Sequence, residues 1–224
     1  MNLFRKSRIS LGIFLIIELI LYYFILTASG DLLVYSSFFA IVVCFLYALI
    51  WRRDWLMIGG LACTVGADFC LVVLSPIQQL WGMVFFLGAQ SLYALRLHRN
   101  QPNRGILIAR GTLSVAAIAV TYLVLKEKTD SLALVSMCYY VNLILNLAAA
   151  CFQYRQNRLL PFGFLCFLLC DTVIGLQVAA GGYLPIPPGS LLHSLIFPAF
   201  NLAWFFYLPS QVILSITASG DTCK

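Results

Sequence analysis

The feature that most constrains this chain is a series of eight apolar runs, mostly of about 19–25 residues. About 20 apolar residues in a helix span a hydrocarbon core about 30 Å thick. Because no water lies at that depth, each run must satisfy its own backbone hydrogen bonds, as a helix does. We therefore predict an all-α polytopic membrane protein, a bundle of eight transmembrane helices in a single domain, 1–224. The helices are expected at about 9–27, 32–50, 55–74, 79–97, 106–125, 131–152, 159–180 and 190–216.

The composition leaves little of the chain for domains outside the bilayer. Of the 224 residues, 62% are hydrophobic and 10% are charged, whereas about a quarter of a soluble domain is charged. The net charge of +6 comes from loop residues, so nucleic-acid binding has no support. Seven of the eight cysteines lie within apolar runs, where cysteine behaves as a small hydrophobic residue. We expect no disulfide framework, no metal and no cofactor.

The positions of Lys and Arg predict the orientation in the membrane. Twelve of the fourteen lie in the N-terminal tail, around the loops after the second, fourth and sixth runs, and in the C-terminal tail. The opposite side holds only Lys126 and Lys128. Both termini are therefore predicted to be cytoplasmic, and the third and seventh helices should both run outward. We expect a multi-pass protein among the lipids of a cell membrane, a bacterial plasma membrane in particular.

Two carboxylates, Asp68 and Asp171, lie inside apolar runs. A charged side chain at that depth costs about 2.5–3.5 kcal/mol on insertion scales, so an intramembrane Asp suggests a functional site. Each lies about a dozen residues into its run, about 18–20 Å from the same membrane face if the helices are parallel. Each helix is followed by one with a glutamine, Gln90 or Gln211, which suggests a parallel repeat. Two adjacent carboxyl groups resist carrying two charges, which gives a proton donor beside a base.

Other polar side chains within the apolar runs are candidates for the same cavity. In the sixth helix, one face carries a stripe of Tyr139, Asn142, Asn146 and Gln153. Lipid cannot supply the hydrogen bonds that these side chains need. Hydrogen bonding between helices and cavity lining explain this stripe equally well. The candidate lining residues are Gln90, Tyr93, Tyr139, Asn142, Asn146, Asn201 and Gln211, with Glu18 and His193 as additional candidates. Alternatively, Glu18 stays protonated and forms a hydrogen bond to a neighbouring helix, and His193 is an exposed residue at the membrane interface.

Four short segments resemble the motifs of the YhhN family, whose animal members are lysoplasmalogenases. They read Gly-Ala-Asp-Phe-Cys-Leu at 66–71, Phe-Leu-Gly-Ala-Gln-Ser-Leu-Tyr at 86–93, Leu-Cys-Asp-Thr-Val-Ile-Gly-Leu at 169–176 and Tyr-Leu-Pro-Ser-Gln-Val-Ile-Leu at 207–214. The resemblance implies an enzyme that hydrolyses the vinyl ether bond of a lysophospholipid, with Asp68 and Asp171 in acid–base roles. Gln90 stands where the family usually has His, and Cys170 where Ser is usual, so the chain resembles a divergent member.

Two functions of other classes stay open. A small transporter agrees with the parallel repeat, the mid-membrane carboxylates and the prolines in the last apolar run. A non-catalytic lipid-binding membrane protein is the other alternative. The chain has no Gly-x-Ser-x-Gly elbow, His-Glu-x-x-His pair or Walker loop, so serine-hydrolase, zinc-protease and NTPase functions lack their signatures.

Overall fold

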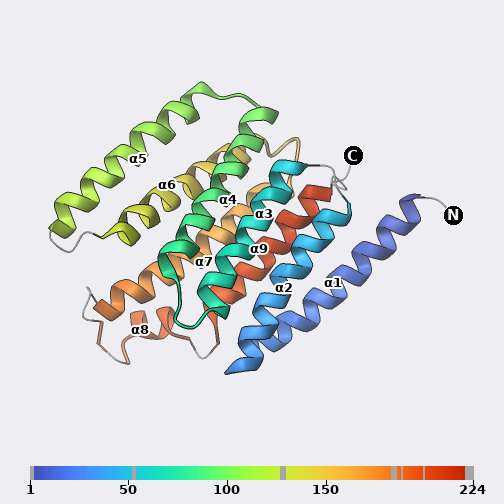
Figure 1. Ribbon diagram of the computed structural model, residues 1–224, viewed down its shortest axis with the longest axis horizontal. Helices are drawn as coiled ribbons and strands as arrows, with labels where there is room; N and C mark the ends of the chain where they lie inside the picture. Colours follow the sequence, from blue (N-terminus) through green and yellow to red (C-terminus); the bar gives the residue numbers. More distant parts are fainter. Residues whose placement is uncertain are drawn as a thin grey trace.

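The computed structural model describes residues 3–51, 54–126, 130–182, 186–187, 189–198 and 200–219. These residues form helices and no strands (Figure 1), as predicted. Seven of the helices are long and apolar enough to cross a membrane. The elements are α1 (Leu3–Thr27), α2 (Asp31–Ile50), α3 (Trp55–Asp68), the π-helical turn η1 (Phe69–Val73), α4 (Gln79–Asn100), α5 (Arg104–Leu125), α6 (Ser131–Phe152), α7 (Leu159–Gly182), α8 (Leu191–Ile196) and α9 (Leu202–Ser219).

Side-chain caps fix where several helices begin. Asp54, Asn103 and Asp130 each precede a helix and accept a hydrogen bond, at 2.7–3.2 Å, from a backbone N–H two or three residues further on. Such caps satisfy N–H groups that have no partner within the first turn of a helix. The polar residues between apolar runs therefore set the helix starts, and most predicted bounds lie within two or three residues of the observed ones.

The eighth predicted helix, 190–216, is divided in the structure. The six-residue α8 ends at Ile196, and α9 begins at Leu202 and has 18 residues. Pro198 lies between them, and a proline cannot continue a helix without losing a hydrogen bond. The side chain of Asn201 then accepts a hydrogen bond from the backbone N–H of Trp204 at 3.3 Å and caps α9. The described residues thus give seven candidate membrane spans and a shorter apolar helix, where eight spans were expected, the last of them with Pro198 and Pro209 inside it.

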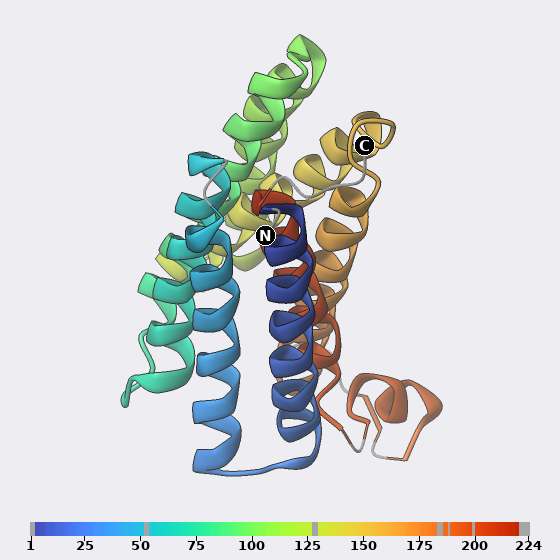
Figure 2. The same ribbon diagram turned by 90° about the vertical axis from the view of Figure 1, so that its right-hand side faces the viewer.

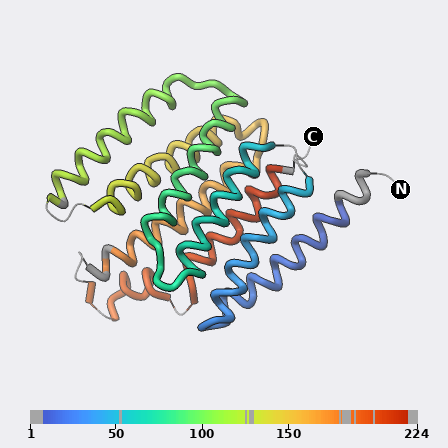
Figure 3. The backbone as a smooth tube through the Cα atoms, in the orientation of Figure 1, coloured from blue at the N-terminus to red at the C-terminus, as the bar shows by residue number. Residues whose placement is uncertain are grey.

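The short helix α9 has a central place in the bundle. It packs against α7, α2, α3 and α1, and it runs through the middle of the bundle in Figures 1 and 2. Helices α1 and α5 lie at opposite edges (Figure 3). The start of α1 and the end of α9 lie at the same end of the bundle, in agreement with termini on one side of the membrane. That this side is the cytoplasmic one stays a prediction.

The contacts of the first four helices recur in the second half of the chain. Helix α3 packs on α4 as α7 packs on α9, and the pairs α2–α3 and α6–α7 correspond in the same way, as do α1–α2 and α5–α6. The halves join through α4 with α6 and α9 with α2. This pattern is the one that a parallel repeat predicts, and it gives α3 and α7, which carry the two aspartates, equivalent places.

Close approach of α3 and α4 depends on Gly60. A Cβ atom at this position would lie 2.1 Å from Cε1 of Tyr93 on α4, far inside van der Waals contact. The tyrosine ring is fully buried and also packs against Phe164, with ring centroids 5.7 Å apart. A side chain at position 60 would therefore separate two helices that position the site.

An ion-pair cluster at Asp54 links α3, α4 and α9 at the end of the bundle where the start of α1 and the end of α9 lie. Its carboxylate contacts Nε of the buried Arg96 at 2.5 Å and Nη2 of Arg99 at 3.0 Å. Arg96 also donates from Nη2 to the backbone oxygen of Thr217 on α9, at 3.3 Å. Burial raises the pKa of Asp54, but the hydrogen bonds and charges of the two arginines outweigh it, so the pKa lies below its ordinary value of 3.8. The cluster fixes the start of α3 against the ends of α4 and α9.

Candidate active site

The two aspartates occupy different local structures on their helices. Asp68 is the last residue of α3, directly before the π-helical turn η1, and Asp171 lies in the middle of α7. The π-helical turn ends the helix, because Leu74 has an extended backbone. Only 3% of the Asp68 surface is exposed, whereas Asp171 is half-buried. The apolar run predicted over 55–74 is therefore one helix whose geometry changes directly after its carboxylate.

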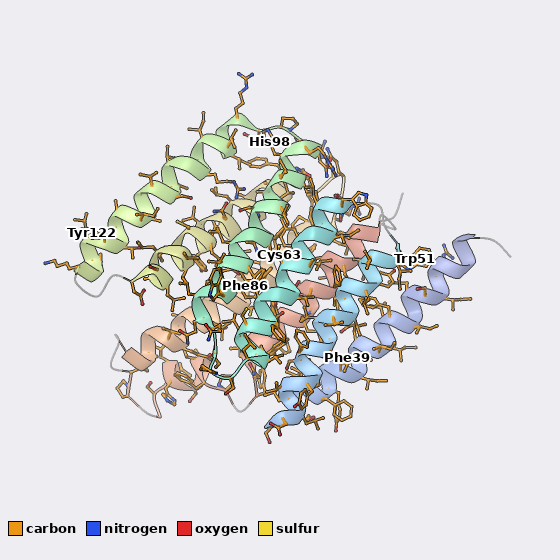
Figure 4. All side chains as sticks on the ribbon, viewed as in Figure 1. Phe39, Trp51, Cys63, Phe86, His98 and Tyr122 are labelled. Atoms are coloured by element: carbon orange, nitrogen blue, oxygen red, sulfur yellow. The ribbon has the colours of Figure 1, made fainter. Side chains whose placement is uncertain are left out.

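Asp68 and Asp171 line one cavity of about 140 Å³. The two carboxyl groups therefore converge, as predicted, and α3, η1, α4, α7 and α9 supply the walls. Apart from the aspartates, the walls consist of apolar, aromatic and cysteine side chains: Leu71, Val72, Phe86, Cys170, Ile174, Ala203, Trp204 and Tyr207. Phe86 is labelled on α4 in Figure 4. Carboxyl groups in such surroundings are poorly screened, so the charge on one acts on the other.

A tyrosine from another helix holds each aspartate. The hydroxyl of Tyr207 on α9 donates to Oδ2 of Asp68 at 2.7 Å, and the hydroxyl of Tyr139 on α6 donates to Oδ2 of Asp171. These bonds fix the rotation of each carboxyl group and occupy one oxygen of each. The other oxygen of each carboxyl group, Oδ1, takes no part in these two bonds.

The two tyrosines are held in turn by an aromatic cluster. Its other members are Phe86 on α4 and Phe167 on α7, and neighbouring ring centroids lie 5.6–6.5 Å apart. Trp204 packs edge-on against Tyr207 at 5.0 Å. Such edge-to-face contacts add to the burial of the rings and keep their orientation. The cluster therefore holds each hydroxyl at its carboxylate and keeps the walls around the pair apolar.

Sequence reasoning did not include Tyr207, Phe86 or Phe167 among the candidate site residues. Two of them lie at the beginning of family-like motifs, 86–93 and 207–214, so the motifs carried a signal for them. Phe167 precedes Asp171 by four residues, which places both on one side of α7. Without the tertiary structure, these three rings read as ordinary apolar residues of a membrane helix.

The amides of the sixth-helix stripe belong to a neighbouring network. Arg110 on α5 donates from Nη1 to Oδ1 of Asn142 and, at 2.8 Å, from Nη2 to Oδ1 of Asn146. Asn146 donates to the backbone oxygen and to Oε1 of Gln90, both at 2.8 Å. None of these four residues lines the carboxyl cavity. Of the predicted set, Tyr139 bonds the carboxyl group of Asp171 but is not among the residues that line the cavity. The amides form hydrogen bonds between helices instead.

The remaining lining candidates have local partners. The Tyr93 hydroxyl lies 3.5 Å from Oγ1 of Thr64, and Nε2 of Gln211 donates to Oγ of Ser210 at 3.2 Å. Asn201 caps α9, as described above. Tyr93, Gln211 and Asn201 are not among the residues that line the carboxyl cavity.

The two additional candidates also lie elsewhere. Glu18 on α1 is buried and accepts a hydrogen bond from the thiol of Cys44 at 3.4 Å. The ring of His193 packs on Phe197 with centroids 5.0 Å apart. Within the described ranges, no group of three or more His, Cys, Asp or Glu side chains could hold a metal ion. Asp68 and Asp171 are therefore the acidic side chains that meet in the cavity.

These features define a class of protein, a helical membrane protein with two carboxyl groups that face one cavity between its helices. The YhhN family model matches residues 38–214, most of the chain, so the chain belongs to the YhhN family. This confirms the resemblance read from the four motifs. The matched range contains both aspartates and both tyrosines that hold them. No curated protein and no solved structure is significantly similar to the chain.

Proposed function

We propose that this protein is a membrane-embedded lipid hydrolase that cleaves the vinyl ether bond of a lysoplasmalogen. The observation that carries the proposal is the pair Asp68 and Asp171, which come from different helices, line one cavity and are each held by a tyrosine. Membership of the YhhN family supports the reaction, because the family is associated with lysoplasmalogenase activity. An acid–base pair is the catalytic group that vinyl ether hydrolysis needs.

The reaction begins with a proton. The protonated carboxyl group delivers it to the vinyl carbon that does not bear oxygen, and an oxocarbenium-like cation forms at the carbon that does. The ionised carboxylate stabilises this cation and takes a proton from the water that adds to it, much as paired carboxylates act in glycoside hydrolysis. The resulting hemiacetal breaks its bond to the glycerol oxygen, which takes the proton that the second carboxyl group received from water. The hemiacetal hydroxyl gives its proton to the first carboxylate, so both carboxyl groups regain their starting states. The products are a fatty aldehyde and a glycerophospho-alcohol.

Burial distinguishes the two carboxyl groups. Asp68 is almost completely enclosed, and Asp171 is half-buried. A negative charge is less costly where some solvation remains, so we assign the proton to Asp68 and the charge to Asp171. Tyr207 occupies Oδ2 of Asp68, so the transferable proton belongs on Oδ1. In this assignment Asp68 is the acid, and Asp171 stabilises the cation and activates water.

The cavity walls suit a substrate with a long hydrocarbon chain. They are mainly apolar, and one of them, Ile174, is 45% exposed, so the cavity extends to the outside of the bundle. A lipid can then enter sideways from the membrane with its chain on apolar side chains. Asp68 and Asp171 are the acidic side chains among the lining residues that it meets.

The two departures from the family pattern affect this site differently. Gln90 bonds Asn146 and does not line the carboxyl cavity. An amide in place of the usual histidine therefore leaves both carboxyl groups in their positions. Cys170 does line the cavity, next to Asp171. A thiol there is a weaker hydrogen-bond donor than the usual serine hydroxyl.

Aldehyde release from a lysoplasmalogen by the purified protein in detergent tests the proposal. Asp68→Asn and Asp171→Asn keep the shape of each side chain and remove its titration, so each should lower turnover by about 100-fold or more. The double variant should be little worse than either single one, because the two groups act as a unit. Each variant is checked for a monodisperse peak on size exclusion. Near-normal release by either folded single variant would contradict the acid–base pair.

Transport is the second candidate function, and the recurring helix contacts of the two halves favour it. A transporter with these carboxylates should release no aldehyde under any condition. Absence of release by the wild-type protein, with all lysoplasmalogen recovered intact, would favour transport over hydrolysis.

A further inference from the structure

A second cavity, of about 240 Å³, lies where α4 ends, α5 begins and α6 ends. It shares no lining residue with the carboxyl cavity. His98, labelled in Figure 4, lies at its α4 wall. Most of the lining surface is apolar, and Leu95, Leu107 and Phe152 are more than half exposed. The cavity therefore opens on the outside of the bundle, where lipid chains would lie.

The charge in this cavity belongs to Arg110. This residue lies six positions after the start of α5, and Asn146 lies six positions before the end of the antiparallel α6, so the two are level. Asn142 lies one turn deeper. Because the guanidinium bonds both amides, it points into the bundle. An arginine that only reached for water would extend toward the nearer end of its helix.

Nothing in the described part of the chain neutralises this charge. The amide oxygens accept the guanidinium N–H groups but carry no net charge, and the ion pairs of the described residues belong to Arg96 and Arg99 with Asp54. An unpaired cation within a membrane-spanning helix is costly. The first turn of α5 lines the same cavity through Asn103 and Ile106. Asn103 caps the Ile106 N–H, and the helix dipole still favours a negative charge near the start of the helix. Both features are complementary to an anion.

We propose that this cavity binds the phosphate headgroup of an anionic membrane lipid, at a site separate from the carboxyl pair. The volume is below the ~300–1,000 Å³ of a pocket that encloses a whole small molecule, so it accommodates a headgroup and the first carbons. The acyl chain of the lipid then lies along the outer face of α5, where Ile108 is 66% exposed. The exposed Arg104, Arg155 and Arg158 lie at the start of α5 and between α6 and α7, at this end of the bundle, which strengthens the attraction for anionic lipids.

Native mass spectrometry of the full-length protein, released from neutral detergent, tests this site. The probes are dioctanoyl phosphatidic acid, dioctanoylglycerol, which has the same chains without phosphate, and inorganic phosphate. The wild-type protein should bind the phosphatidic acid at least about tenfold more tightly than either other probe, the scale of a charge-assisted bond. Equal binding of the diacylglycerol, or phosphate binding as tight as lipid binding, would overturn the proposal of a lipid headgroup site.

Three variants locate the binding at Arg110. Arg110→Gln should lower the affinity for phosphatidic acid at least about tenfold. Asn142→Asp should do the same, because it keeps the side-chain shape and supplies the guanidinium with an internal counter-charge. Arg104→Gln, at an exposed position of the same helix, is the matched control and should change the affinity less than about threefold. Unchanged binding by Asn142→Asp, or by a monodisperse Arg110→Gln protein, would overturn the site, and the aspartate variant decides if the glutamine variant does not fold.

Discussion

Tyr139→Phe should slow vinyl ether cleavage more than Tyr207→Phe does. Each change removes one hydroxyl that donates to a carboxyl group, and each keeps a ring that packs in the aromatic cluster. The assignment above gives Asp171 the negative charge and Asp68 the proton. Tyr139 then bonds an ionised acceptor and Tyr207 a neutral one, so the two hydroxyls contribute unequally.

The magnitudes follow from the acceptors. A hydrogen bond to a charged group contributes about 1.5–3 kcal/mol, and one to a neutral group about 0.5–1.5 kcal/mol. At 1.36 kcal/mol for each factor of ten in rate, the expected loss is about 10- to 150-fold for Tyr139→Phe and about 2- to 13-fold for Tyr207→Phe. The losses should appear in kcat, since the tyrosines position groups that act in the transition state.

The assay measures initial rates of aldehyde release in detergent across lysoplasmalogen concentrations, with melting temperatures measured on the same samples. Tyr93→Phe is the matched control, because this tyrosine is also fully buried but its hydroxyl faces Thr64 and no carboxylate. It should leave the rate of cleavage unchanged. A larger loss for Tyr207→Phe than for Tyr139→Phe would refute the assignment of the charge, and no loss in either variant would refute a role for both hydroxyls.

Three further predictions concern the fold and its orientation. Gly60→Ala should disrupt α3–α4 packing, because its Cβ would lie 2.1 Å from the ring of Tyr93. Gly111→Ala is the control, because its Cβ would have nothing within 4 Å. The Gly60→Ala protein should have the lower melting temperature of the two, and equal melting temperatures would contradict the packing argument. Asp54 has a lowered pKa, so its ion pairs stabilise the fold above pH 3.8 and lose their effect as pH falls through the folded-state pKa. The difference in stability between the wild-type protein and Asp54→Asn should therefore be largest near neutral pH and vanish in acid. A difference that does not change with pH would contradict this role of the ion pairs. Pro187→Cys should react with a membrane-impermeant maleimide from outside intact cells, and labelling only after permeabilisation would reverse the predicted orientation.

Local features of the sequence determined the helices. In a membrane, a backbone must satisfy its own hydrogen bonds, so the length and apolarity of each run predict a helix without reference to its neighbours. The predicted 131–152 agrees with α6 (Ser131–Phe152) at both ends. The prolines of the last apolar run were visible in the sequence, but the whole run 190–216 was assigned to one span, whereas α8 ends before Pro198 and α9 begins after Asn201.

The sequence also indicated the centre of the candidate site. An aspartate deep in an apolar run is costly enough to stand out on its own, and equal spacing placed Asp68 and Asp171 at one level. The partners of the two aspartates did not follow from spacing. Tyr207 bonds an aspartate 139 positions away in the chain, and helical periodicity describes only residues that are close in sequence.

Only the tertiary structure decided how the polar stripe of the sixth helix divides. Tyr139 bonds Asp171, whereas Asn142, one turn further along the same face, bonds Arg110. The sequence had grouped this arginine with the basic loop before the fifth helix, because its charge suggests water and its position lies near a helix end. Its actual partner depends on how α5 is rotated against α6, and that rotation follows from the packing of many side chains on both helices, which no single stretch of sequence specifies.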